Sequence, residues 1–147
     1  STLRQQVKQT GNKFDDVVID VGGRDSTALR SALMLTDALI VPFAPRSFDV
    51  WSFSDMSHLI QEAKSIRGDF PVYAVLNNAD ISGSDNEEAI EAIHEYPELT
   101  YLNAPIKRRK SIATAAGQGL SVLEYTPKDP KACDEITRLV DSVFISK

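Results

Sequence analysis

The sequence predicts an α/β domain with a mostly parallel sheet and helices on both faces. Short apolar runs alternate along the chain with longer segments whose apolar residues recur at helical spacing. An apolar run without polar alternation is typical of a strand buried on both faces. Strands that alternate with helices predict parallel pairing through crossover helices. The length of 147 residues, 42% of them hydrophobic, fits a single domain spanning residues 1–147 with a substantial core.

Four apolar runs are the predicted strands, and each ends at a turn rich in Gly, Pro, Asn or charged residues. They cover residues 16–21, 38–43, 71–76 and 101–106, of which the last is the weakest. The first run ends on Asp20 and continues into Gly22 and Gly23. Open α/β sheets hold their ligands at the carboxyl ends of parallel strands. We therefore expect Asp20 to lie at a ligand-binding edge of the sheet.

Local signals predict the helices between these runs. We expect helices over residues 2–12, 26–36, 48–67 and 84–94, a basic, Ala-rich helix that reaches residue 118, and a last helix that begins near residue 129. Ser84 and Glu87 form a capping-box signature, and Gly119 is a natural helix stop. Asp129 is expected to cap the last helix, with Pro130 in its first turn.

Helical spacing also predicts which side chains face the core. In the helix over residues 48–67 they are Trp51, Met56, Leu59, Ile60 and Ala63; in the last helix they are Ile136, Leu139, Val140 and Val143. Trp51 and Phe53 are two residues apart and point to different sides of a helix. Either the apolar stripe is wide enough to bury both, or one of them faces a partner.

Composition limits the classes of protein to consider. No apolar run approaches the roughly 20 residues needed to cross a bilayer. The lone cysteine, Cys133, excludes an internal disulfide framework and suits a reducing cytosol. The net charge of −5 argues against nucleic-acid binding by the whole surface, although a local basic patch remains compatible with it. We therefore expect a cytoplasmic protein without a membrane span.

Asp20 is the first candidate for chemistry. A carboxylate that closes a buried strand is costly unless a positive or hydrogen-bonding group meets it. Mg²⁺, bound directly or through water, is a natural partner. Gly22 and Gly23 allow tight turning and close approach of the backbone to a ligand. The alternative is that Asp20 only caps the turn or helix that follows.

The order of motifs resembles the ParA/MinD family of partitioning ATPases, which carry a deviant P-loop. The matching motifs are Phe-Asp-Asp-Val-Val-Ile-Asp at residues 14–20, Ala-Leu-Ile-Val-Pro at 38–42 with Pro45, Phe48 and Asp49, Val-Leu-Asn-Asn at 75–78, and Pro105-Ile106 followed by Arg109 and Gly-Leu-Ser-Val at 119–122. The resemblance runs from about residue 14 to the C-terminus and rests on the order and spacing of these motifs.

The resemblance implies roles for individual residues, with ATP and Mg²⁺ as cofactors. Asp20 matches the Walker B aspartate, and residues 22–25 match the switch segment that responds to the γ-phosphate. Asn77 or Asn78 matches the polar residue that touches the adenine base. Pro105 and Ile106 lie where the family closes the base pocket with backbone.

The chain also departs from the family pattern. It has Val21-Gly22 where many relatives have Pro-Pro, and no Gly-Lys-Ser/Thr loop occurs in the 147 residues. In the family the P-loop and the strand after it come earlier in the chain. We therefore expect a P-loop NTPase-like fold without its N-terminal P-loop unit, the C-terminal portion of a longer ATPase domain. Because a phosphate site needs converging N–H groups and usually a lysine, we do not expect this chain alone to bind ATP·Mg well or to hydrolyse it.

Lys107, Arg108, Arg109 and Lys110 form the only run of four basic residues. Cations at a helix N-terminus oppose the macrodipole by about 0.3–1 kcal/mol each. A sequence that tolerates this cost is compatible with polyanion binding, and the resemblance implies non-specific, salt-dependent contacts with DNA phosphates. Arg46 and Lys64 are candidates to extend the patch. The alternative is a solvated basic surface.

The leading hypothesis is therefore a ParA-like ATPase in plasmid or chromosome partitioning. The resemblance implies an ATP-bridged homodimer, a ParB-like adaptor protein and association with the bacterial nucleoid. A second hypothesis is a non-catalytic DNA- or protein-interaction module that has lost its nucleotide site. A third, a phosphorylated receiver domain, requires an acidic pair and a suitably placed lysine, and neither is visible.

Overall fold

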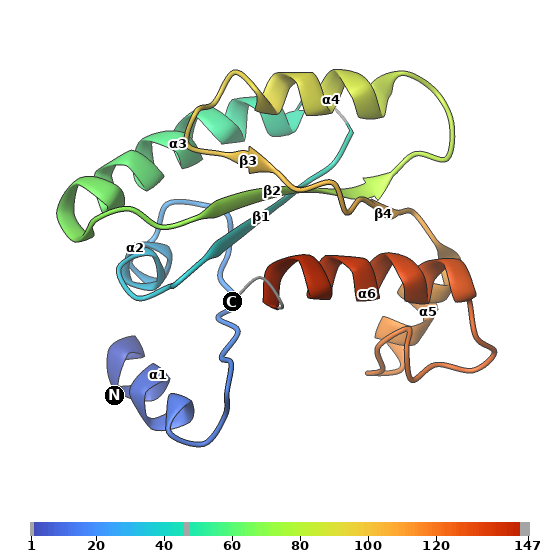
Figure 1. Cartoon of the computed structure of the whole chain (residues 1–147), viewed down its shortest axis with the longest axis horizontal. Helices are drawn as coiled ribbons and strands as arrows, with labels where there is room; N and C mark the ends of the chain where they lie inside the picture. The colour runs from blue at the N-terminus through green and yellow to red at the C-terminus, as the bar shows by residue number, and fades with distance from the viewer. Residues whose placement is uncertain (1, 46–47, 145–147) are drawn as a thin grey trace.

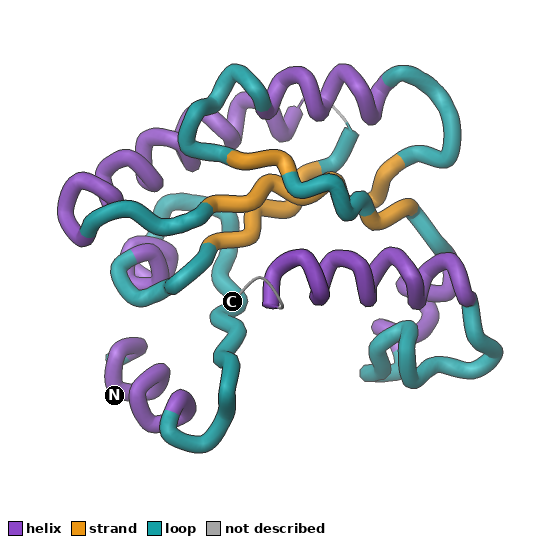
Figure 2. Tube along the Cα trace, viewed as in Figure 1, coloured by secondary structure: helices purple, strands orange, loops and turns teal. Residues whose placement is uncertain are grey.

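The computed structural model describes residues 2–45 and 48–144 and has the predicted α/β architecture (Figures 1 and 2). Its sheet consists of β1 (Leu39–Phe43), β2 (Val72–Ala79), β3 (Thr100–Tyr101) and β4 (Ile106–Lys107). Every pairing among these strands is parallel. β1 pairs with β2, and the chain passes from β3 to β4 along β2. The predicted mostly parallel sheet is thus confirmed.

The described part of the chain contains six helices. They are α1 (Leu3–Gly11), α2 (Thr27–Leu33), α3 (Phe48–Arg67), α4 (Asp85–Ile93), α5 (Lys110–Gly117) and α6 (Pro130–Phe144). In Figure 1, α3 and α4 lie on one side of the sheet, and α5 and α6 lie on the other. α2 contacts α3 and α1, while α6 contacts β4. No helix among residues 2–45 and 48–144 is both long enough and apolar enough to cross a membrane.

The core forms between β2 and α3. Val72, Ala74 and Leu76 of β2 are almost completely buried, as is Ile60 of α3. Met56, Leu59 and Ala63 are buried on the same helix, as predicted from its spacing. Tight packing of this kind makes the core sensitive to the loss of even one methylene group.

The inward position of Phe53 settles half of the question that the sequence left open. Its ring meets the ring of Phe43 edge-on, with centroids 5.5 Å apart, and lies 6.1 Å from the ring of Tyr96. Phe53 is therefore a core residue. The side chain of Trp51 lies outside the described part of the structure.

Helix ends follow the predicted signals at two places. The carboxylate of Asp129 accepts a hydrogen bond from the Ala132 N–H at 3.2 Å and so caps α6. Gly119 has a φ of 71°, and its N–H donates to the Ala116 carbonyl at 3.0 Å. The Leu120 N–H donates to the Ala115 carbonyl, also at 3.0 Å. These two hydrogen bonds form a Schellman motif, which ends α5 at the predicted glycine.

The strand predicted over residues 16–21 does not form. The segment is a loop that pairs with no described strand, and Val18 is 81% exposed. An apolar run becomes a strand only where a neighbour takes up its backbone hydrogen bonds. β1 pairs with β2, and no described strand joins its other edge. Asp20 is therefore exposed, and it does not end a paired strand.

The predicted strand over residues 101–106 is interrupted. β3 and β4 both pair with β2, but the chain turns between them, where the Ala104 N–H donates to the Leu102 carbonyl at 2.7 Å. Pro105 follows this turn and lacks an N–H for the ladder. These two features explain the break.

Two further predictions at helices were wrong in detail. Ser84 stands at the N-terminus of α4, but its side chain caps no N–H group and instead donates to Glu88 at 3.0 Å. In α6, Val140 is 45% exposed, and Ala132 is the residue that is fully buried. Ile136, Leu139 and Val143 are only half-buried. α6 lies against β4, which is two residues long and cannot cover the whole apolar stripe.

Replacing Ile60 with Ala should lower the free energy of unfolding by about 2–5 kcal/mol, because the deletion leaves a cavity in the core. Urea unfolding followed by circular dichroism measures this change. Ile66→Ala on the same helix is the matched control: Ile66 is 67% exposed, so its truncation should change stability by less than about 0.5 kcal/mol. If the two substitutions lowered the free energy of unfolding equally, the assignment of Ile60 to the core face of α3 would be wrong.

Candidate functional site

Two adjacent asparagines mark the carboxyl end of the central strand. Asn77 is in register with Ile106 of β4, and the pairing is irregular between Asn77 and Ala79. Asn78 lies at this irregularity with a φ of 53°, a left-handed conformation that asparagine tolerates better than most residues. Both asparagine side chains are exposed. The irregularity therefore places two amide groups at the end of the sheet where α/β proteins bind ligands.

Pro105 and Ile106 border the same place. Pro105 is half-buried, whereas the side chain of Ile106 is only 6% exposed and belongs to the interior. The Arg108 N–H donates to the Ala79 carbonyl at 3.0 Å and continues the contact beyond β4. The structure thus brings Asn77, Pro105 and Ile106 together, and Ile106 can offer a ligand only its backbone.

The segment that contains Asp20 lies at a different edge of the sheet. Val21, Gly22 and Gly23 line a groove of about 300 Å³ together with residues 39–42 of β1. Leu29 of α2 and Phe53 and Met56 of α3 complete its lining, so the groove is largely apolar. Gly22 and Gly23 therefore border β1, whereas Asn77 and Asn78 border β4. The structure does not join these predicted binding residues into one pocket.

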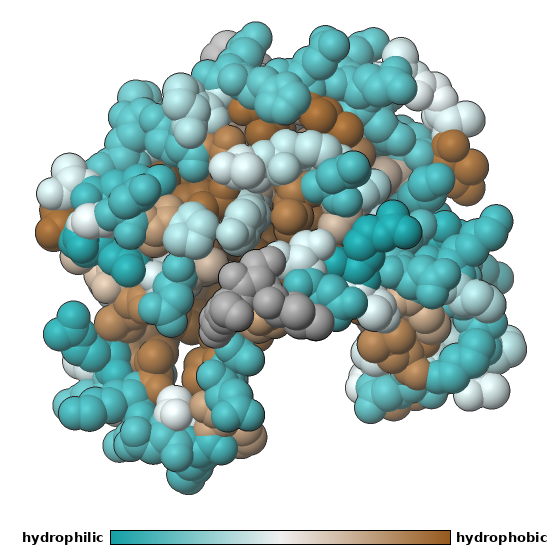
Figure 3. Space-filling model, in the orientation of Figure 1, coloured by the Kyte–Doolittle hydropathy of each residue, from teal (hydrophilic) through white to brown (hydrophobic). Residues whose placement is uncertain are grey.

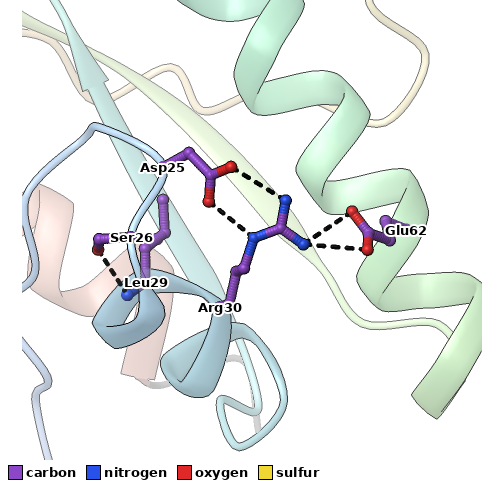
Figure 4. A network of polar contacts seen from close by, with 5 residues as sticks. All are labelled: Asp25, Ser26, Leu29, Arg30 and Glu62. Atoms are coloured by element: carbon purple, nitrogen blue, oxygen red, sulfur yellow. Dashed lines mark hydrogen bonds and ion pairs between the residues drawn. The ribbon is translucent and has the colours of Figure 1, made fainter.

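An arginine joins the end of this segment to two helices (Figure 4). Arg30 of α2 donates to Asp25 from Nε at 2.7 Å and from Nη2 at 3.0 Å. Its Nη1 lies 3.0 Å from both carboxylate oxygens of Glu62 on α3. The guanidinium lowers the pKa of Asp25 from its ordinary value through these hydrogen bonds. Sequence reasoning missed this contact, because Asp25 precedes the helix of Arg30 and Glu62 is 32 residues further on.

Within the predicted basic run, Arg109 is committed to an ion pair. Its Nη2 lies 2.6 Å and its Nε 3.0 Å from the two carboxylate oxygens of Glu135 on α6. The Lys107 N–H also donates to Glu135, at 3.2 Å. The side chains of Arg109 and Glu135 are 17% and 15% exposed. Hydrogen bonding to Arg109 is the main reason why the pKa of Glu135 is lowered.

The other cations of the predicted basic patch differ in how far they are exposed to solvent and in whether they form ion pairs. Arg108 and Lys110 are exposed, and Lys107 is half-buried. Lys64 lies on α3, where its Nζ is 2.6 Å from Asp69, and α3 is on the opposite side of the sheet from α5. It therefore does not extend the basic run. Arg46 lies outside the described residues.

Asp20 offers one carboxylate for a metal ion. No group of three or more His, Cys, Asp or Glu side chains converges within the described part of the chain. Mg²⁺ is commonly held by one or two carboxylates together with waters and substrate phosphates. The exposed Asp20 fits that manner of binding, whereas a site built from protein ligands alone does not fit.

No family model matches the chain. Over 143 residues, 97% of this chain, the sequence is 24% identical to the maintenance of carboxysome distribution protein A of Halothiobacillus neapolitanus (strain ATCC 23641 / c2). The chain spans 66% of the length of that relative. The similarity loosely supports the resemblance to the ParA/MinD family.

Replacing Glu135 with Gln should reduce the free energy of unfolding by about 1–3 kcal/mol near neutral pH, because a partly buried guanidinium loses its charged partner. Folding lowers the pKa of Glu135, so its stabilisation is complete above the pKa of the unfolded chain and is lost as the pH falls through the folded-state pKa. The difference between wild type and variant should therefore shrink on acidification. Urea unfolding at a series of pH values measures it. Asp134→Asn, an exposed neighbour on α6, should show little effect, and an equal effect would contradict the assignment.

Replacing Arg30 with Ala should release the segment that ends at Asp25, because the Arg30 side chain holds the carboxylates of both Asp25 and Glu62 and so ties this segment to α3. Amide hydrogen exchange of residues 21–26 should accelerate, because in the variant this segment can open locally without first breaking the two ion pairs. The exposed neighbour Arg24 supplies the control substitution to Ala. Unchanged protection in the Arg30 variant would show that other contacts hold the segment.

Proposed function

We propose that this chain is part of a ParA-like ATPase that positions a cellular cargo. The observation that carries the proposal is the gathering of Asn77, Pro105 and Ile106 at the carboxyl end of a parallel sheet, in the motif order of that family. The relative named above maintains the distribution of carboxysomes, as its name states.

The exposed amides of Asn77 and Asn78 suit the edge of a purine base. Amide groups offer both donors and acceptors, and the backbone at Pro105 and Ile106 would border the same base. In the proposed assembly, Asp20 holds Mg²⁺ through water. The segment from Gly22 to Asp25 responds to the terminal phosphate, and Arg30 connects that segment to α3.

The groove beside β1 supports the proposal that a further strand completes the sheet. One side of the groove is β1, whose outer edge carries no described strand, and the other side includes Val21, at the end of an apolar segment that joins no described strand. An extended strand in the groove would satisfy the backbone groups of β1. It would also cover Ile40, which is 39% exposed. We propose that a phosphate-binding loop follows such a strand, because no residue of this chain supplies that loop.

The second candidate is a non-catalytic module that binds DNA or a partner protein and is indifferent to ATP. The position of Asp20 favours it, since this residue is exposed and apart from the Asn77 group. In this proposal the basic residues at the start of α5 bind DNA, and Asn77 and Asn78 have no nucleotide to contact.

The native gene product, purified from its source cell, distinguishes these two candidates. If it is the ATPase, its intact mass should exceed that of this chain and it should hydrolyse ATP. Asp20→Asn should then lower the turnover number about 100-fold or more, because electrostatic stabilisation at the phosphates is lost. Asp15→Asn, at another exposed carboxylate of the same segment, should leave turnover within about twofold of wild type.

A native product with the mass of this chain, and with DNA binding unaffected by ATP, would contradict the ATPase and favour the module. Equal loss of turnover in both variants would remove Asp20 from its proposed role.

A further inference from the structure

The loop between β2 and α4 leaves the sheet directly after the two exposed asparagines. Residues 81–85, which form this loop and the start of α4, are all exposed. Ile81 is the large apolar residue of the loop and is 78% exposed. Figure 3 shows a small apolar patch at the right edge of the molecule, where Figure 1 places this loop. Packing against the core therefore does little to fix the loop, so its shape depends on polar contacts.

One side chain, that of Asn86, hydrogen-bonds both backbone groups of Asp80. The Asp80 N–H donates to Asn86 Oδ1 at 3.0 Å, and Asn86 Nδ2 donates to the Asp80 carbonyl at 2.9 Å. Asn86 lies in the first turn of α4 and is half-buried. Its amide offers one donor and one acceptor to Asp80, much as a neighbouring strand would. The contact ties the N-terminus of α4 to the chain that follows β2.

The residue before Asp80 is held from the direction of β4. Ala79 is only 1% exposed, and its carbonyl accepts the Arg108 N–H at 3.0 Å. Asn78 comes next toward the N-terminus, with a φ of 53°. A residue other than glycine keeps a left-handed backbone only where its surroundings over-determine that conformation. The contacts of Ala79 and Asp80 supply this constraint on the C-terminal side of Asn78.

A local role in α4 does not account for Asn86. Asparagine is a weak helix former, because its side chain competes for nearby backbone groups. It favours the N-cap position, which Ser84 occupies here. Asn86 instead uses both polar atoms of its side chain on Asp80, six residues earlier. The side chain therefore serves the loop and not the helix.

We propose that Asn86 is a positioning residue for the nucleotide site at the end of β2. By holding Asp80 it fixes the left-handed turn at Asn78, and this turn sets the direction of the amides of Asn77 and Asn78. Direction matters because a hydrogen bond weakens steeply as its geometry departs from linear. The inference rests on the proposed function, from which it takes the contact with the base, and it adds a residue that touches no ligand itself.

A lost contact with the base has a different kinetic signature from a lost contact with the phosphates. The base does not react, so contacts with it stabilise the bound substrate and the transition state equally. Their loss raises the KM and leaves kcat unchanged. Groups that stabilise the reacting phosphates lower kcat when they are removed. Asn86 should therefore affect the KM for ATP but not the binding of inorganic tripolyphosphate, which has no base.

Steady-state ATP hydrolysis by the native gene product tests the inference. Asn86→Ala should raise the KM for ATP about tenfold, because one or two hydrogen bonds to the base are weakened. We expect kcat, and the inhibition constant of tripolyphosphate as a competitive inhibitor, to stay within about twofold of wild type. Glu87→Ala truncates the exposed neighbour in the same turn of α4 and should leave all three constants unchanged.

Amide hydrogen exchange of the same protein without ATP is the second measurement. Asn86→Ala should accelerate exchange at Asp80, whose acceptor is removed, and at Asn78, whereas Glu87→Ala should not. If Asn86→Ala does not keep the wild-type circular dichroism spectrum, Asn86→Asp takes its place. Asn86→Asp keeps the size of the side chain and the acceptor for the Asp80 N–H. It loses the donor to the Asp80 carbonyl, so it should also raise the KM for ATP.

The possible outcomes separate this inference from the proposed function. If the wild-type product hydrolyses ATP and a folded Asn86 variant keeps its KM, the positioning role is overturned and the ATPase stands. An inhibition constant for tripolyphosphate that rises as much as the KM would also overturn the role, because the effect would not lie at the base. Unchanged exchange at Asp80 would do the same, since other contacts would then hold the loop. A wild-type product without ATP hydrolysis would contradict the proposed function and the positioning role together.

Discussion

The central strand β2 is the constraint on which the other elements depend. Its residues are paired along both edges, with β1 on one side and with β3 and then β4 on the other. Val72, Ala74, Val75 and Leu76 are all buried, so the strand packs on both faces. A central strand determines how far along its axis each neighbouring strand lies, because the hydrogen bonds of a parallel ladder fix the register. The exposed asparagines at its end owe their position to the same pairing.

Polar contacts hold the parts that the sheet does not reach. The guanidinium of Arg67, at the end of α3, donates to the Leu33 carbonyl at 2.9 Å and lies 4.6 Å from the centre of the Phe70 ring. Arg30 joins α2 to α3 through an ion pair with Glu62, in the C-terminal third of α3. These contacts place α2 beside the open edge of β1. They therefore shape the groove in which we propose that a further strand lies.

The structure divides its cations into those that organise the fold and those that face solvent. Arg109 and Arg30 each meet a carboxylate from a distant part of the chain, whereas the exposed Arg108 and Lys110 form no ion pair in the described structure. The DNA binding proposed for the second candidate function depends on this division, because a cation that is already paired releases no counterions on binding. A count of charges along the sequence gives every Lys and Arg a charge of +1 and does not distinguish paired cations from exposed ones.

The sequence by itself determined the helices, the parallel pairing of the sheet, the end of α5 at Gly119 and the start of α6 at Asp129, because periodicity, capping and turn chemistry act over a few residues. It also predicted a strand that ends just before Asn77 and another that reaches Ile106, and the structure pairs these two residues across β2 and β4. Only the tertiary structure decided that residues 16–21 join no described strand, that Arg109 meets Glu135, and that Asp20 lies away from the asparagines. Each of these depends on whether a distant segment supplies a hydrogen-bond or charge partner, and local sequence does not encode the presence of that partner.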